Sequence, residues 1–162
     1  MTILQTDLKF LLAHPAHMIA FGFGSGLAPK APGTVGTLLG LPLFWLIAAA
    51  TPHLPGQIAI VIAAFLLGVW ACGRTGAALG VADHGGMVWD EIVAYALILL
   101  FTPAGWLWIA LAFALFRLFD ILKPWPIRLA DTHLKNGFGV MFDDLLAAGY
   151  AIAVIKGLQW LA

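Results

Sequence analysis

Four or five apolar stretches, separated by short connections, are the feature of this sequence that most limits how the chain can fold. They lie at residues 37–50, 58–72, 92–101, 106–116 and 145–162. The chain is 62% hydrophobic and 10% charged, whereas soluble proteins are roughly 45–50% apolar and about 25% charged. We therefore predict an all-α, polytopic membrane bundle of four to five hydrophobic helices. Several stretches are shorter than the roughly 20 residues that cross a bilayer, so some helices should be short or broken.

The organisation of the chain outside these stretches is simple. It contains no internal repeat, low-complexity tract or polar linker, so we expect one domain over residues 1–162. The first twenty residues have leucines at helical spacing but also carry Asp7, Lys9 and the His14-Pro15 break. This pattern predicts a short interfacial helix and not a signal peptide. The single cysteine, Cys72, cannot form an intrachain disulfide and is interpreted as a small core residue.

The charges predict how the bundle is oriented. The connections at 51–57 and 102–105 contain no Lys, Arg, Asp or Glu, whereas the basic residues of the connections fall on the opposite side: Lys30, Arg74, Lys123, Arg128 and Lys135. Basic residues concentrate in cytoplasmic loops, so that side should face the cytoplasm of a bacterial inner membrane. Lys156 lies within the last stretch, near the outer side, where we expect it to snorkel or to pair with a helix end.

Acidic residues from three separate segments should meet on this cytoplasmic side. Asp90 and Glu91 open the third stretch, Asp120 ends the fourth, and Asp143 and Asp144 open the fifth. Five like charges in a low dielectric repel one another unless something neutralises them. Mg²⁺ prefers oxygen ligands and is commonly held by one or two carboxylates together with phosphate oxygens, so the acids predict a magnesium site.

A structural explanation competes with the metal site. Acidic residues near helix N-termini are stabilised by the helix dipole by about 0.3–1 kcal/mol, and both doublets lie near predicted helix starts. Asp120 lies near a helix C-terminus instead, and Arg117 and Lys123 stand three residues away on either side of it. It could simply pair with either of them.

Two further segments are suited to a phosphate. The Gly- and Pro-rich segment 21–37 precedes the first stretch, and a helix that begins near Thr34 would add its positive dipole end, with Lys30 as a further donor. This segment could equally be a loop that closes over the bundle with close glycine packing. Arg117, Lys123 and Arg128 supply cationic groups at the cytoplasmic boundary, although Arg128 could only mark the cytoplasmic side.

The histidines give little sign of a metal site. None has the spacing of zinc ligands. His84 follows Asp83 directly and could act as an acid or as a supporting donor, while the other histidines are interpreted as peripheral.

Four segments in the right order, FGFGSGLAPKAPGTVGT, DHGGMVWDE, FRLFDILKPWPIR and GFGVMFDD, closely resemble the motifs of the phosphatidylglycerophosphatase A family. The likeness runs from Phe21 to Asp144. It implies an enzyme, a Mg²⁺-dependent lipid phosphatase that converts phosphatidylglycerophosphate to phosphatidylglycerol, with one or two Mg²⁺ ions. It also implies a phospholipid substrate in the membrane; nucleic acid and an obligatory protein partner are not expected.

The resemblance and the residue chemistry together assign two sets of site residues. The catalytic and metal-binding set is Asp90, Glu91, Asp120, Asp143 and Asp144. The substrate-binding set is Lys30, Thr34, Asp83, His84, Arg117, Lys123 and Arg128.

Two other functions compete with a lipid phosphatase. A small ion or proton transporter also uses intramembrane acids, but it needs polar groups through the whole membrane thickness, and the outer half carries only Lys156. A non-catalytic lipid-binding or scaffold protein would need basic residues alone and would have no use for clustered acids.

Overall fold

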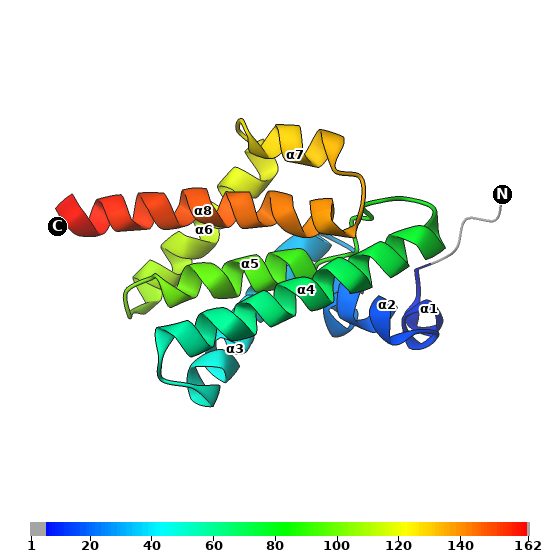
Figure 1. Ribbon diagram of the computed structural model, residues 1–162, viewed down its shortest axis with the longest axis horizontal. Coiled ribbons are helices and arrows are strands. Elements are labelled where there is room, and N and C mark those ends of the chain that lie inside the picture. The colour runs from blue at the N-terminus through cyan, green and yellow to red at the C-terminus, as the bar shows by residue number, and fades with distance from the viewer. Residues whose placement is uncertain (1–5, 162) are drawn as a thin grey trace.

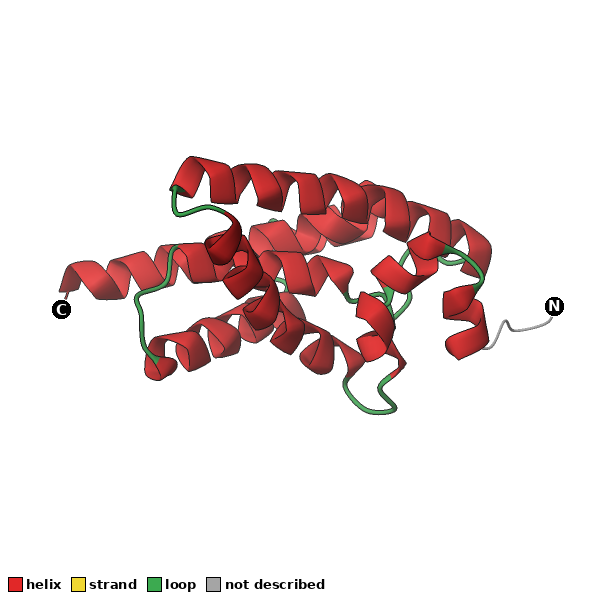
Figure 2. Ribbon diagram, turned by 90° about the horizontal axis from the view of Figure 1, so that it is seen from below, coloured by secondary structure: helices red, strands yellow, loops and turns green. Residues whose placement is uncertain are grey.

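The computed structural model describes residues 6–161 and consists of helices joined by short connections (Figures 1 and 2). No strand occurs among the residues described. The all-α prediction is confirmed. In chain order the elements are α1 (Leu8–Leu12), α2 (Pro15–Ala20), the 3₁₀ helix η1 (Gly22–Leu27), α3 (Pro32–Ala50), α4 (Leu54–Leu79), α5 (Trp89–Leu100), α6 (Trp106–Leu122), α7 (Ile127–His133) and α8 (Gly137–Leu161).

Three of these helices, α3, α4 and α8, are long and apolar enough to cross a membrane. Local sequence explains the bounds of the first two. Proline lies in the first turn of both α3 and α4, where its missing N–H costs no helical hydrogen bond. Gly80 ends α4 in a left-handed conformation with a φ of 72°, which glycine adopts without steric cost.

Helix α5 differs from the predicted third membrane span. Its twelve residues reach only about 18 Å, against about 30 Å of hydrocarbon. Nine of the twelve are buried, because α5 packs against α3, α4, α6 and α8. It is a short central helix that other helices surround, and the apolar character of its sequence reflects this burial.

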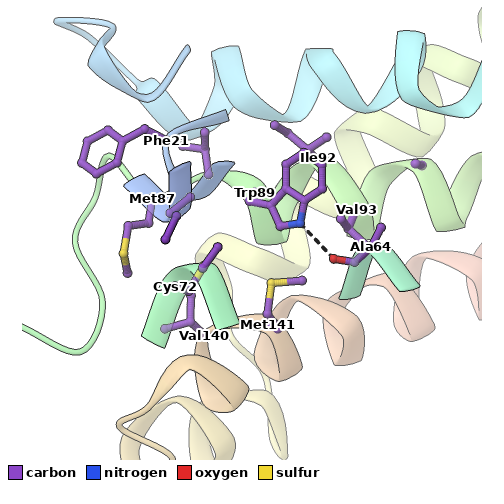
Figure 3. Close-up of a cluster of buried hydrophobic side chains, with 14 of the residues drawn as sticks. Phe21, Ala64, Cys72, Met87, Trp89, Ile92, Val93, Val140 and Met141 are labelled. Carbon is purple, nitrogen blue, oxygen red and sulfur yellow. Dashed lines mark hydrogen bonds between the residues drawn. The ribbon is translucent and has the colours of Figure 1, made fainter. Parts of the chain in front are cut away.

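Two apolar clusters hold the bundle together on either side of α5. The first joins α2, α4 and α5 to the start of α8 around Trp89, whose indole N–H donates to the Ala64 carbonyl oxygen at 3.0 Å (Figure 3). The second joins α5, α6 and α8 around Tyr95 and Phe116. Cys72 is fully buried in the first cluster, as its apolar surroundings in the sequence predicted.

The N-terminal segment forms two short helices where one was predicted, because Pro15 starts α2 after the His14 cap. A side-chain hydrogen bond of 3.0 Å between His17 Nδ1 and Thr75 Oγ1 fastens α2 to α4. Burial, and then the nearby positive charges of His14 and Arg74, lower the pKa of His17 below its usual value. Leu8 and Leu12 are exposed on α1, as an interfacial helix requires.

Glycines let neighbouring segments approach closely. A Cβ at Gly36 would overlap Val88, and a Cβ at Gly40 would overlap Tyr95 and the Ile92 carbonyl oxygen. These contacts bring α3 directly against α5. The Gly-rich segment 21–37 therefore serves close packing, one of the two interpretations that its sequence allowed.

The two ends of the molecule differ in charge. The α3–α4 connection, the α5–α6 connection and the end of α8 lie together at one end, and the N-terminal helices and the α4–α5 loop lie at the other (Figure 1). The uncharged end carries the exposed indoles of Trp106 and Trp160, which are typical of a membrane interface. Lys156 near this end is exposed and donates to Gln159 at 3.0 Å, so it pairs with a neighbouring side chain and not with a helix end.

Candidate active site

Five carboxylates from three helices gather at the charged end of the bundle. Asp90 and Glu91 lie in the first turn of α5, and Asp120 lies in the last turn of α6. The last two, Asp143 and Asp144, do not open a helix as predicted, since α8 begins six residues earlier at Gly137. Stabilisation by a helix N-terminus therefore does not explain this second doublet.

Arg117 binds two of these carboxylates. One of its terminal nitrogens lies 3.0 Å from Glu91 Oε1 and 2.9 Å from Asp120 Oδ2. The second Glu91 oxygen accepts a hydrogen bond of 2.9 Å from the Thr37 hydroxyl. The Glu91 carboxylate also packs against Gly33 in the first turn of α3. Glu91 thus lies at the helix end that the sequence suggested for a phosphate.

Lys123 binds a second pair of carboxylates. Its ammonium group lies 2.6 Å from Asp143 Oδ2 and 3.1 Å from Asp131 Oδ1. Burial alone would lower the pKa of Lys123, but the hydrogen bonds and charges of Asp143 and Asp131 outweigh that effect and raise the pKa above its ordinary value. The lysine is therefore permanently cationic at neutral pH.

Asp90 and Asp144 directly neighbour the ion-paired Glu91 and Asp143 in the sequence, and both are buried, at 7% and 3% exposed. Asp90 Oδ1 accepts a hydrogen bond from the Glu91 backbone N–H. Neither carboxylate has a cationic partner in the region the structure describes.

Two buried side-chain atoms in the described part of the chain lack a hydrogen-bond partner, and both belong to this site. One is an acceptor, Asp144 Oδ2, and the other is a donor, Arg117 Nε. Buried polar groups are normally paired. An unpaired acceptor and an unpaired donor in one cluster suit a ligand that brings both a positive and a negative charge.

The donor chemistry fits magnesium. The unpaired acceptor of the site, Asp144 Oδ2, is a carboxylate oxygen, the type of ligand that this hard cation prefers. Mg²⁺ commonly takes only one or two carboxylates, with phosphate oxygens completing its shell. Asp90 and Asp144 are the two that carry no salt bridge. Within residues 6–161, no three His, Cys, Asp or Glu side chains are close enough together to hold an ion, because Arg117 and Lys123 draw the other carboxylates to themselves.

The remaining predicted residues lie around the rim. Lys30 and Arg128 are exposed and form no ion pair with the residues described. Thr34 is half-buried in the first turn of α3. Asp83 is exposed in the α4–α5 loop, and His84 Nδ1 accepts a hydrogen bond from the Gly86 N–H, which fixes the shape of this loop.

The structure adds two residues to the predicted set. Thr37 lies one turn after Gly33, and its contact with Glu91 depends on how α3 packs against α5, which the local sequence does not show. Asp131 follows Lys123 by eight residues, and the turn that returns α7 to Lys123 leaves no local pattern in the sequence.

Comparison with known proteins decides the family. The model of the phosphatidylglycerophosphatase A family matches residues 18–159. The chain belongs to the phosphatidylglycerophosphatase A family. Its membership confirms the resemblance seen in the four motifs, and with it the prediction that the protein is a phosphatase.

Individual members of the phosphatidylglycerophosphatase A family are similar over nearly the whole chain. The protein of that name from Haemophilus influenzae is 48% identical over 94% of this chain and 93% of its own length. The one from Escherichia coli is 38% identical over 94% and 89%. A putative phosphatidylinositol-3-phosphatase from Bacteroides thetaiotaomicron is 39% identical over 88% and 92%. None of the solved structures matches the chain.

Proposed function

We propose that this protein hydrolyses phosphatidylglycerophosphate to phosphatidylglycerol and inorganic phosphate, with Mg²⁺ as cofactor, at the cytoplasmic face of a bacterial inner membrane. The names of the Haemophilus influenzae and Escherichia coli relatives support the substrate. The concentration of basic residues at the end of the bundle that holds the acids supports the cytoplasmic face.

The observation that carries the proposal is the pair of unpartnered atoms in the acidic cluster. Asp144 Oδ2 needs a cation or a donor, and Arg117 Nε needs an acceptor. A magnesium phosphomonoester supplies both. The burial of Asp90 and Asp144 keeps bulk water away from these groups, and this strengthens every electrostatic contact that a bound phosphate would make.

Each group of the site has a distinct part in this reaction. Asp90 and Asp144 would hold the ion, which supplies the positive charge that stabilises the phosphoryl oxygens as negative charge develops on them. Arg117, fixed by Glu91 and Asp120, would orient the phosphate through its free Nε. Water would attack phosphorus and give up a proton, the bond between phosphorus and the glycerol oxygen would break, and that oxygen would take up a proton, so that the products are phosphatidylglycerol and inorganic phosphate.

Which lipid headgroup the site accepts is tested by comparing substrates directly. The Bacteroides thetaiotaomicron relative is named for a different phosphomonoester lipid, a phosphatidylinositol 3-phosphate. Proteins similar to this chain therefore carry names for two different headgroups. Both lipids have a phosphomonoester at the membrane surface, which is the part that the acidic cluster would contact.

The experiment is phosphate release by the purified protein in detergent. Phosphatidylglycerophosphate, phosphatidic acid and phosphatidylinositol 3-phosphate are compared, each with EDTA and after Mg²⁺ is restored. We expect the first to be the best substrate, with activity lost in EDTA and regained with Mg²⁺. Activity that persists in EDTA would refute the metal-dependent mechanism. A preference for another lipid would refute phosphatidylglycerophosphate as the substrate.

Two isosteric variants test the carboxylates. Asp90→Asn and Asp144→Asn should each lower kcat/KM by about 100-fold or more, because a metal ligand supplies several kcal/mol of transition-state stabilisation. Asp7→Asn is the matched control: Asp7 is exposed and caps α1, and asparagine caps equally well. Full activity in Asp144→Asn would remove that residue from the site.

A further inference from the structure

A groove opens between α4, α5 and α8 next to the acidic cluster. It encloses about 240 Å³, and nine of its ten lining residues are apolar. The tenth is Asp90. The surface of the groove is therefore apolar throughout, and Asp90, which borders it without turning a polar atom into it, belongs to the candidate active site.

The packing of the helices shows how the groove is oriented. Gly68 of α4 contacts both Trp89 and Met141, so the later part of α4 lies beside the first turn of α5, and the two helices run antiparallel. Phe65 and Met141 accordingly line the end near Asp90, and Ile58 and Leu97 line the far end. The seven residues from Asp90 to Leu97 correspond to a length of about 10 Å along α5.

The surroundings of the groove point to hydrocarbon as its occupant. Its outer wall belongs to α4, which is long and apolar enough to span a membrane, and Ile62 on that wall is 54% exposed. Water is not held stably in a cavity without two to four polar partners. The path begins at Asp90 and runs toward the uncharged end of the bundle, which is the direction in which the tail of a lipid extends when its headgroup lies at the cluster.

We propose that this groove binds one acyl chain of the lipid substrate and thereby places the phosphorylated headgroup beside Asp90. This inference rests on the proposed function for the nature of the substrate. Ile62, Ala94 and Leu97 are then positioning residues: they contact the chain and not the reacting phosphate. Binding energy from the remote chain is used to align the reacting group.

The first test compares substrates with long and short chains in variants that narrow the groove. Ala94→Phe and Ile62→Trp should lower kcat/KM for a long-chain phosphatidylglycerophosphate by about tenfold or more, the scale on which a pocket senses small changes in fit. Activity on a dihexanoyl analogue should stay unchanged. The control is Leu66→Trp, one turn further along α4, where the side chain is 61% exposed and lies outside the groove. If kcat/KM falls equally on both substrates, or falls on neither, the proposal that the groove binds an acyl chain is refuted.

The second test needs no turnover. Phosphatidylglycerol with a diazirine at the end of one acyl chain is photolysed with the full-length protein in vesicles that contain EDTA. Labelling should fall on the groove sides of α4 and α5 and should decrease in Ala94→Phe but not in Leu66→Trp. Labels spread over the lipid-facing side of α4 alone would refute the proposal.

The two tests separate the failure of the groove from the failure of the phosphatase. Groove labelling by a protein that releases no phosphate from any lipid would refute the phosphatase assignment and leave the groove as a lipid site. If the protein releases phosphate normally, with kinetics in the groove variants that do not depend on acyl-chain length, and the groove is not labelled, then only the acyl-chain proposal is refuted.

Discussion

The contact between η1 and the α4–α5 loop gives a sharp test of how the site is held in place. A Cβ at Gly26 would overlap the backbone carbonyl oxygen of Gly86. A backbone atom cannot move aside by changing rotamer, so Gly26→Ala must push the loop away from η1. Overpacking of this kind costs about 1–3 kcal/mol, and we expect about 2–3 kcal/mol here because no side chain can yield.

This cost should be visible in thermal unfolding and in activity. A loss of about 1 kcal/mol lowers the melting temperature by about 2–4 °C for a chain of this size, so Gly26→Ala should melt about 4–12 °C lower. Phosphate release at 25 °C should fall by more than the loss of folded protein explains, because the displaced loop leads directly into the first turn of α5. Both are measured in the same detergent.

Gly85→Ala is the matched control for this substitution. Gly85 neighbours Gly86 in the same loop, but a Cβ there meets nothing within 4 Å and its φ is not in the left-handed region. Its melting temperature should equal or slightly exceed that of the wild type. The reasoning is refuted if Gly26→Ala melts within about 1 °C of the wild type, or if the melting temperature of Gly85→Ala falls as far as that of Gly26→Ala. The close packing of η1 on this loop would then not hold the site in place.

Two further predictions concern side chains that join two helices through hydrogen bonds. Thr37→Val removes the hydroxyl that donates to Glu91 and accepts from Arg117, and it should lower phosphate release about tenfold or more, the scale of lost hydrogen bonds to charged groups. Thr37→Ser should retain activity, and equal behaviour of the two variants in the phosphate assay would count against this role. Because the fold lowers the pKa of His17 below the ordinary histidine value of about 6.5, the unfolded chain binds more protons near and below that pH. The melting temperature should therefore fall as pH drops from about 7.5 to about 5.5. His17→Gln should reduce this decrease in melting temperature. If the variant keeps the pH dependence of the wild type, protonation of His17 is not its cause.

Much of the architecture could be predicted from the sequence because membrane helices carry their signal locally. A run of apolar residues predicts a helix wherever it packs, and the uneven distribution of basic residues predicts which ends of the helices lie together. The same information could not show that α5 is a short central helix, since apolar residues that face other helices look the same in sequence as those that face lipid.

The sequence could predict which residues belong to the candidate site, but not which of their side chains bind one another. The acids could be assigned to one end of the bundle from helix order alone. Whether Arg117 binds Asp120 in its own helix or Glu91 in another depends on how α5 and α6 pack, and it binds both. The place of Glu91 at the start of α3 likewise follows from the glycines that bring α3 against α5, a contact between segments more than fifty residues apart.

The shortness of α5 has a consequence for the surrounding lipid. A twelve-residue helix is about 12 Å shorter than the hydrocarbon layer is thick. If the far end of α5 lies level with one boundary of the hydrocarbon layer, its acidic end lies well below the headgroup plane on the opposite side. Lipids beside it must then thin locally or lower their headgroups, each at a cost that grows with every ångström of mismatch. The thickness of the host bilayer thereby becomes a determinant of how readily substrate enters, and the rate of this protein should differ between bilayers built from shorter and longer lipids.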